Sequence, residues 1–254
     1  MADQAQWLCG LHAVTAALRN HPERLDSIRV ERRRRDARMR ALLEEAQRHG
    51  VPVSLTDRQE LDRLSAQTRH QGVIARYAGA VEQVRGERDL AELLATVQGP
   101  PLLLILDGVQ DPHNLGACLR SADAAGVHAV LVPTDRAVGL TATVRKVASG
   151  AAESIPFFQV TNLARALRQL QDQGLWLIGA AGEAEQSLYD VDLTGPVALV
   201  LGAEEKGLRR LTRETCDVLV CIPMAGSVES LNVSVAAGIF LFEAVRQRHI
   251  AKRS

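Results

Sequence analysis

The chain has 254 residues, enough for one large domain or two modest ones, and a hydrophobic content of 46% that can fill a core. No apolar run approaches the roughly 20 residues of a membrane helix, and we expect neither a membrane span nor a secretory signal. The formal net charge of +0 hides a basic first part, with 14 Lys+Arg against 10 Asp+Glu up to Ala80, and an acidic remainder, with 16 against 20.

The first 77 residues are predicted to form a small α/β unit. Apolar residues at helical spacing predict helices over residues 10–20, 34–49 and 57–64. Short apolar segments predict strands at residues 28–30, 51–55 and 72–77. The next residues are polar, contain Gly79 and Gly86 and show no clear period. We therefore assign residues 78–99 to a linker and a connecting helix that begins at Arg88.

Residues 100–254 alternate between strands and helices, which predicts a second α/β domain. Strands are predicted near residues 102–107, 128–133, 175–181, 197–202 and 217–222. Helices are predicted near residues 114–125, 141–149, 161–173 and 231–248. Strands that are apolar along their whole length are typical of a mostly parallel sheet covered by helices on both faces. Ligands bind beyond the carboxyl ends of the strands in such sheets, so the loops there are the candidate site.

The cysteines give no sign of a metal or a disulfide framework. Cys9, Cys118, Cys216 and Cys221 are scattered and form no C-x-x-C pair. The last three stand in apolar surroundings and are predicted to be small core residues. We therefore expect a cytoplasmic protein without a bound metal.

A basic run from Arg29 to Arg40 has two interpretations. Its arginines, Arg32 to Arg35 above all, could be a solvated helix face or a patch that contacts phosphates. The run itself leaves both interpretations open.

Three loops follow predicted strands in the second domain. The first, from Asp107 to Arg120, contains Asp-Pro-His-Asn114, which can turn the chain and cap a helix. Arg120 lies inside that helix, where a surface ion pair is the ordinary role of an arginine. The second loop, Gly202 to Gly207, differs from a phosphate-binding loop because Leu208 stands where lysine is required.

The third loop, from Met224 to Asn232, contains Ser227 and Ser230 but no G-x-S-x-G nucleophile elbow. Ser230 and Asn232 are also ordinary helix-capping residues. No G-x-G-x-x-G follows a strand. A hydrolase, an ATPase and a common dinucleotide fold are therefore all poorly supported.

Taken together and in this order, the loops resemble the three motifs of the SPOUT-class RNA 2′-O-methyltransferases, in the TrmH/RlmB branch. The matching segments are Asp107-x-x-x-Asp-Pro-x-Asn-x-Gly-x-x-x-Arg120, Leu201-Gly-Ala-Glu204 and Ile222-Pro-Met-x-Gly-Ser-Val-x-Ser-Leu-Asn-Val-Ser-Val235. The segments Gly10 to Val14 and His70 to Ala75 resemble the L30e-like RNA-binding domain that precedes the catalytic domain in this branch. The resemblance covers nearly the whole chain.

The resemblance implies a fold and a cofactor. The fold would be an α/β protein with an L30e-like substrate-binding domain over residues 1–77. A SPOUT catalytic domain would follow over residues 100–254, with a mostly parallel sheet and a C-terminal trefoil knot. The cofactor would be S-adenosyl-L-methionine, held by the backbone at Gly202, Ile222 and Leu231, where apolar strand ends offer adenine a dry slot. The family also implies a homodimer with active sites at its interface.

Five further positions match the family's catalytic site: Asn114, Arg120, Glu204, Ser230 and Asn232. The implied reaction displaces a sulfonium methyl by a ribose 2′-oxygen, so positioning should supply much of the acceleration. A guanidinium rarely loses its proton, so Arg120 would more easily clamp a phosphate or donate to the developing alkoxide than act as the base. Ser230 and Asn232 would orient ribose or backbone groups, and Glu204 would fix one of these donors. Glu205 stands where relatives often have glycine, which leaves the choice between these two glutamates open.

The function expected on this resemblance is 2′-O-methylation of a guanosine in the peptidyl-transferase P loop of 23S ribosomal RNA. One alternative is a 2′-O-methyltransferase that acts on tRNA or on another rRNA site, and a second is a non-enzymatic RNA-binding module. The aromatic content is only 3%, so base-stacking platforms are scarce. RNA contacts are therefore expected to rely on phosphates, shape and the 2′-hydroxyl.

Overall fold

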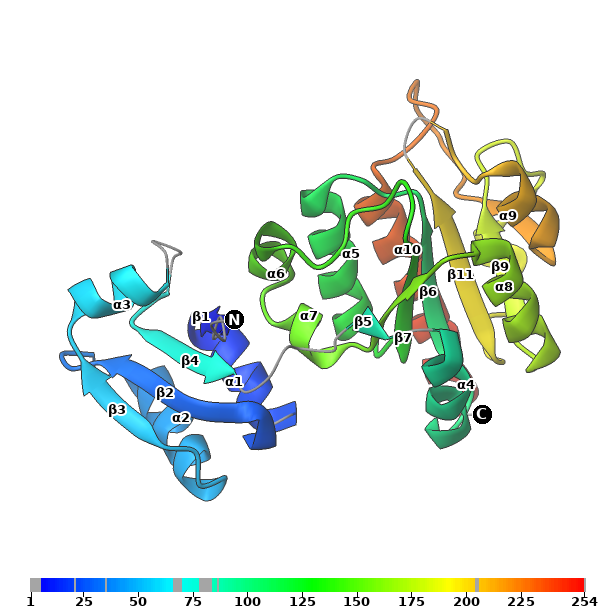
Figure 1. Cartoon of the computed structure of the whole chain (residues 1–254). Helices are drawn as coiled ribbons and strands as arrows, with labels where there is room; N and C mark the ends of the chain where they lie inside the picture. Colours follow the sequence, from blue (N-terminus) through cyan, green and yellow to red (C-terminus); the bar gives the residue numbers. More distant parts are fainter. Residues whose placement is uncertain are drawn as a thin grey trace. The chain divides into compact units, whose positions relative to one another are not determined.

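The computed structural model describes residues 6–20, 22–34, 36–65, 70–77, 84–85, 87–203 and 206–253. By its contacts the chain divides into two compact units (Figure 1). The first comprises residues 1–82 together with Ser149–Ser154, and the second comprises residues 83–148 and 155–254. Within the described ranges, no helix is long and apolar enough to cross a membrane.

The first unit is built on a four-stranded sheet with the order β1-β4-β2-β3. Its strands are β1 (Gln6–Cys9), β2 (Leu25–Glu31), β3 (Val53–Thr56) and β4 (Val73–Tyr77). Strand β4 pairs antiparallel with β1 and β2, whereas β2 and β3 are parallel. The helices that precede and connect the strands are α1 (Leu11–Asn20), η1 (Pro22–Arg24), α2 (Ala37–Arg48) and α3 (Arg58–Leu64). The three predicted helices and three predicted strands are confirmed, while β1 was not predicted.

The core of this unit follows from the spacing of its apolar residues. Ile28 and Val30 alternate along β2 and are buried, as are Met39 and Leu42 on one face of α2. Helix α2 begins later than predicted because the Asp36 side chain accepts hydrogen bonds from the first free backbone N–H groups, those of residues 38 and 39.

The second unit contains an eight-stranded sheet with the order β10-β12-β9-β11-β6-β7-β8-β5. All pairings between its described strands are parallel. The strands are β5 (Val84–Arg85), β6 (Leu102–Asp107), β7 (Ala129–Pro133), β8 (Phe157–Val160), β9 (Trp176–Ala180), β10 (Gln186–Ser187), β11 (Val197–Gly202) and β12 (Val218–Cys221). This confirms the predicted parallel α/β sheet, although β5, β8 and β10 were not predicted.

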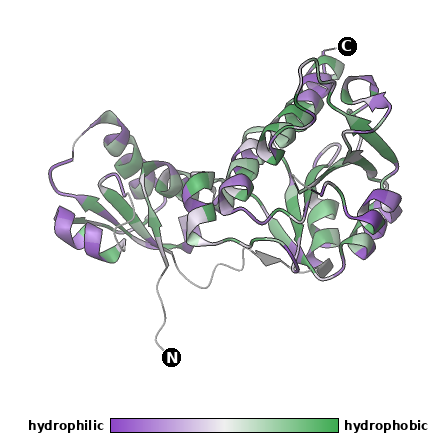
Figure 2. Cartoon of the chain, turned by 90° about the horizontal axis from the view of Figure 1, so that it is seen from above, coloured by the Kyte–Doolittle hydropathy of each residue, from purple (hydrophilic) through white to green (hydrophobic). Residues whose placement is uncertain are grey.

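Helices cover both faces of this sheet, as its fully buried strands require. They are α4 (Glu87–Thr96), α5 (Pro112–Ala124), α6 (Ala142–Ala148), α8 (Leu163–Asp172), α9 (Arg210–Thr215) and α10 (Val233–Ala251), with η2 (Leu188–Asp190) as a short turn. The four-residue helix α7 (Ala151–Ser154) belongs to the first unit. Leu103 and Ile105 of β6 share one core cluster with residues of α8, whereas α5 and α10 contact each other, and α10 contacts β11. Figure 2 shows the strands of this unit mainly in the hydrophobic colour.

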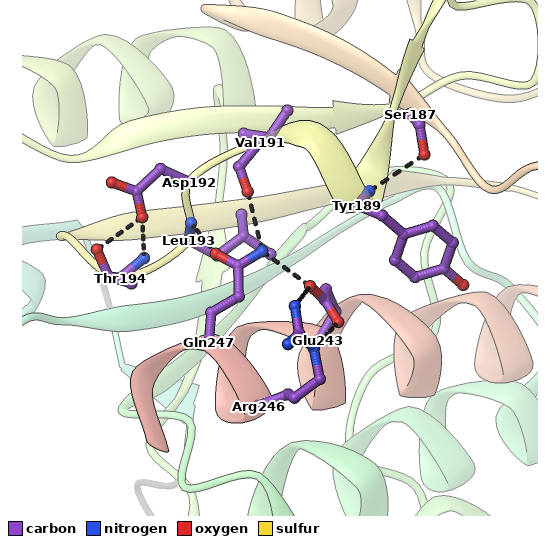
Figure 3. Close-up of polar contacts among 9 residues, drawn as sticks. All are labelled: Ser187, Tyr189, Val191, Asp192, Leu193, Thr194, Glu243, Arg246 and Gln247. Carbon is purple, nitrogen blue, oxygen red and sulfur yellow. Dashed lines mark hydrogen bonds and ion pairs between the residues drawn. The ribbon is translucent and has the colours of Figure 1, made fainter. Parts of the chain in front are cut away.

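The C-terminal half of α10 is tied to the segment that follows η2. The Gln247 side chain donates to the carbonyl of Val191 at 3.0 Å and to Glu243 at 2.8 Å, and it accepts from the Leu193 N–H at 2.8 Å (Figure 3). Arg248 donates to four backbone carbonyls, those of residues 100, 101, 193 and 195. These bonds hold the C-terminal half of α10 in place.

Candidate functional site

A pocket of about 200 Å³ lies beyond the carboxyl ends of the adjacent strands β9, β11 and β12. Its lining consists of strand ends, the loops behind them and the first turns of α10: Ala180–Gly182, Leu201–Ala203, Gly207, Val220–Ile222, Met224, Glu229–Leu231, Val233, Ala236 and Phe240. The lining is largely apolar, with many small residues that leave backbone groups accessible. Among the described lining residues, Glu229 is the single charged one. The pocket therefore suits a ligand with an apolar part and a positive charge.

The wall formed by the loop after β11 depends on glycine. A Cβ on Gly202 would lie 2.0 Å from the carbonyl carbon of Gly207, which is closer than real Cβ contacts allow. Gly207 itself has φ +59 and donates from its N–H to the carbonyl of Ala203 at 2.8 Å. This tight return brings the chain back across the end of β11.

The three residues predicted to bind the cofactor, Gly202, Ile222 and Leu231, all line this pocket, as does Ser230. The end of β9 and the residues after it, Ala180 to Gly182, line the pocket too and were not predicted to do so. The signal was faint, because these residues are all small and two of them lie inside the predicted strand 175–181. Their small size is nevertheless what lets the third strand end approach the pocket.

Asn114 and Asn232 are brought together although they lie far apart in the sequence. Asn232 donates from Nδ2 to Oδ1 of Asn114 at 3.0 Å, and its own Oδ1 caps α10 by accepting from the N–H of Ser234 at 2.9 Å. The Ser234 hydroxyl donates to the same oxygen at 2.6 Å. Asn232 is therefore both a helix cap and a link between the starts of α5 and α10.

The remaining predicted residues are not gathered into the pocket. Arg120 lies on the exposed side of α5, does not line the pocket, and has no hydrogen bond or ion pair with a described residue. The predicted Glu204 lies outside the described residues, together with Glu205. The geometry thus assembles one group around the pocket and a second at Asn114 and Asn232, with Arg120 apart from the pocket lining.

An ion pair between the partly exposed Arg209 and a buried carboxylate fixes the chain after the β11 loop. Arg209 donates from Nε to Oδ1 of Asp107 at 2.5 Å and from its backbone N–H to Oδ2 at 3.0 Å. It also reaches Asp135, after β7, at 3.3 Å. The Asp107 side chain is fully buried, so this pair ties the loop after β11 to the ends of β6 and β7.

Two of the cysteines, Cys9 and Cys216, are not activated nucleophiles. Burial raises the pKa of Cys216 to about 12, with the nearby Asp217 and Asp107 adding to the effect, and burial raises the pKa of Cys9 to about 11. Cys118 is buried as predicted, whereas Cys216 and Cys221 are only half-buried, because both lie near strand ends. Covalent catalysis by Cys9 or Cys216 is therefore disfavoured at neutral pH.

A parallel α/β sheet with a small-molecule pocket at the carboxyl ends of neighbouring strands defines an α/β ligand-binding domain. Many enzymes have a domain of this class. Comparison with known proteins narrows this class. Residues 101–242 match the model of the SpoU rRNA Methylase family, and residues 7–81 match a model described as RNA 2′-O ribose methyltransferase substrate binding. The chain therefore belongs to the SpoU rRNA methylase family.

Relatives and solved structures agree with this assignment over nearly the whole length. The chain is 58% identical to the 23S rRNA (guanosine-2′-O-)-methyltransferase RlmB of Ralstonia nicotianae, over 97% of this chain and 98% of that protein. It is 57% identical to the RlmB of Shewanella oneidensis, over 94% and 96%. The crystal structure of the SpoU methyltransferase AviRb from Streptomyces viridochromogenes in complex with AdoMet is similar with a TM-score of 0.74 at 25% identity, covering 96% of this chain and 90% of that one.

Proposed function

We propose that this protein transfers a methyl group from S-adenosylmethionine to the ribose 2′-oxygen of a guanosine in 23S ribosomal RNA. The observation that carries the proposal is the pocket at the ends of β9, β11 and β12, because it gathers Gly202 at the end of β11 with Ile222 and Leu231 from the segment after β12. Relatives more than half identical over nearly the full chain are named for this reaction. We place the target guanosine in the peptidyl-transferase P loop and the protein in the cytoplasm, where ribosomal RNA is modified.

The lining of the pocket fits this cofactor. Backbone groups at Gly202, Ile222 and Leu231 can read the edge of adenine, while the surrounding apolar side chains exclude water from its faces. The Glu229 carboxylate favours a ligand with positive charge. When bound, S-adenosylmethionine supplies the electrophilic methyl group. We further propose that the segments around this pocket form the trefoil knot expected from the resemblance.

The polar residues beside the pocket are assigned to positioning of the nucleotide. Asn114 and Asn232, joined by their hydrogen bond, orient ribose or backbone groups together with Ser230. Arg120 clamps the adjacent phosphate or donates to the developing alkoxide. Glu204 fixes one of these donors.

A homodimer is proposed through the exposed side of α10. Val235 and Phe242 are two turns apart, so they lie on one side of the helix, and each is about half exposed, at 51% and 50%. Ile239 lies between them and is partly exposed. An apolar stripe of this kind is typical of a protein interface. Phe242→Glu should convert the dimer to a monomer in sedimentation, and an unchanged sedimentation coefficient would contradict this interface.

Cofactor binding can be tested with a matched pair of glycine variants. Gly202→Ala forces a Cβ into the backbone of Gly207, whereas a Cβ on Gly195 would meet nothing within 4 Å. Calorimetric titration with S-adenosylmethionine should show at least about tenfold weaker binding for Gly202→Ala, or ~1.4 kcal/mol, and wild-type binding for Gly195→Ala. If the wild-type protein shows no heat of S-adenosylmethionine binding, the proposed methyltransferase activity is wrong and the alternative of a non-enzymatic RNA-binding module is favoured.

Arg120 can be tested separately from the cofactor pocket. Arg120→Ala should bind S-adenosylmethionine normally, because Arg120 does not line the pocket, and should methylate 23S rRNA about 100-fold to 1,000-fold more slowly. Arg168→Ala, on the exposed side of α8, is the matched control and should keep full activity. Near-normal methylation by Arg120→Ala would contradict the assigned role.

A further inference from the structure

A second hollow, of about 600 Å³, lies within the first unit. Its walls come from α1, α2 and α3 and from the loops beside β2 and β4. The charged side chains in its lining are Glu31, Arg34, Arg38, Arg58 and Asp62, and His12 joins them. Three guanidinium groups and two carboxylates thus face one concave space.

The floor of this hollow is held by hydrogen bonds. His70 is only 4% exposed; its Nε2 lies 2.9 Å from Oδ1 of Asp62, and its Nδ1 accepts from the Gly72 N–H at 3.0 Å. Because Nδ1 is the acceptor, the ring proton lies on Nε2 and is donated to Asp62. Gln71 has φ 50 and accepts on Oε1 from the Leu11 N–H at 3.3 Å. The floor is therefore formed before any ligand arrives.

Two of the guanidinium groups are available to a ligand. Arg38 and Arg58 are exposed and make no side-chain hydrogen bond or ion pair with any residue that the structure describes. Arg34 is bound to Asp36 at 2.6 Å and lies across Gly72, where a Cβ would meet its Cδ at 2.8 Å. Arg34 therefore forms part of the wall, while Arg38 and Arg58 can bind an anion.

The carboxylates distinguish this hollow from a simple phosphate site. Asp62 is held by His70 through one oxygen, and Oδ2 has no hydrogen bond to a described residue. A carboxylate accepts N–H groups, and guanine presents two adjacent ones on its Watson–Crick edge. A phosphodiester pairs with arginine. Cationic and anionic groups in one hollow therefore match a nucleotide better than they match an isolated phosphate.

We infer that this hollow binds one unpaired guanosine nucleotide of the RNA substrate, with the phosphodiester on Arg38 and Arg58 and the base edge on Asp62. The inference rests on the proposed function, because it assumes that RNA is the substrate.

The test uses the full-length protein and two fluorescein-labelled RNA pentamers, UUGUU and UUUUU. Arg38→Gln and Arg58→Gln should each weaken binding of UUGUU about five- to tenfold and lower the salt slope by about 0.7. Arg40→Gln is the matched control, since Arg40 is exposed on the same helix but does not line the hollow. The inference is wrong if Arg38→Gln and Arg58→Gln weaken binding no more than Arg40→Gln does.

The base contact is tested by Asp62→Asn, which keeps an oxygen for His70 but replaces the other acceptor by a donor. Wild-type protein should prefer UUGUU over UUUUU by at least about fivefold, and Asp62→Asn should abolish that preference while leaving the salt slope unchanged. A wild-type protein without this preference, or a preference that survives Asp62→Asn, would overturn the inference.

Methylation of 23S rRNA, measured on the same wild-type preparation, separates this inference from the proposed function. If the protein methylates 23S rRNA but the arginine variants bind the pentamers as the wild type does, the nucleotide site in the hollow is wrong and the proposed activity stands. If the variants weaken pentamer binding as predicted but the protein transfers no methyl group, the nucleotide site stands and the proposed activity is wrong.

Discussion

Replacing Arg209 by alanine should lower the free energy of unfolding of the second unit far more than replacing its neighbour Arg210. Arg209 loses a 2.5 Å charge-assisted bond to a carboxylate that is 0% exposed, and such a bond contributes about 1.5–3 kcal/mol. Removing one partner of a fully buried pair costs about 3–5 kcal/mol. Arg209 is 34% exposed and its backbone N–H still reaches Asp107, so we expect about 2–3 kcal/mol.

Arg210 is the matched control, since its pair with Glu214 is exposed, at 75% and 55%, and should contribute only about 0.3–0.5 kcal/mol. The chain has two tryptophans, Trp7 in the first unit and Trp176 in the second. Urea unfolding followed by the fluorescence of Trp176, in a Trp7→Phe background, therefore reports on the second unit alone. Equal losses for the two arginine variants would refute the argument that burial of the Asp107 carboxylate decides the cost.

Two further substitutions test the anchoring of the sheet. Arg248→Met should cost about 2–4 kcal/mol in urea unfolding, because it removes donors to four carbonyls at about 1 kcal/mol each, while Lys252→Met at the exposed end of the same helix should cost almost nothing. Burial lowers the pKa of His128 below its ordinary 6.5, and its Nδ1 accepts from the Leu102 N–H. The unfolded chain then binds more protons, so this contribution to stability is complete above pH 6.5 and is lost as the pH falls through the lowered pKa. His128→Gln should therefore flatten the pH dependence of the urea midpoint below pH 6.5, and an unchanged dependence would contradict this role.

The fold could be predicted where apolar patterns are long, and it was missed where they are short. Residues 102–107 and 197–202 were predicted as strands and are β6 and β11. Strand β8 has only four residues, Phe157–Val160, and follows directly after Pro156, so it gave no period to recognise. Helix α10 was predicted over 231–248 but begins after the Asn232 cap and ends at Ala251. It extends beyond residue 248 because the residues of its last turn do not disfavour a helical backbone.

The pocket could be predicted in part. Its position followed from the rule that ligands lie at the carboxyl ends of parallel strands, and the residues from two of its loops were named in advance. The loop after β9 could not be named, because Ala180 and Gly182 carry no functional group. Nor could sequence reveal that Arg120 does not line the pocket, since that depends on how α5 is rotated against α10. The hydrogen bond between Asn114 and Asn232 likewise depends on the tertiary fold.

The central claim is tested most directly by transferring a labelled methyl group from S-adenosylmethionine to unmodified 23S rRNA and mapping the labelled nucleotide. The account predicts that the label appears as a 2′-O-methyl group on one guanosine in the peptidyl-transferase P loop. Label on a base atom would contradict the reaction. Label confined to tRNA or to another rRNA site would contradict the proposed substrate but not the proposal that the pocket binds S-adenosylmethionine.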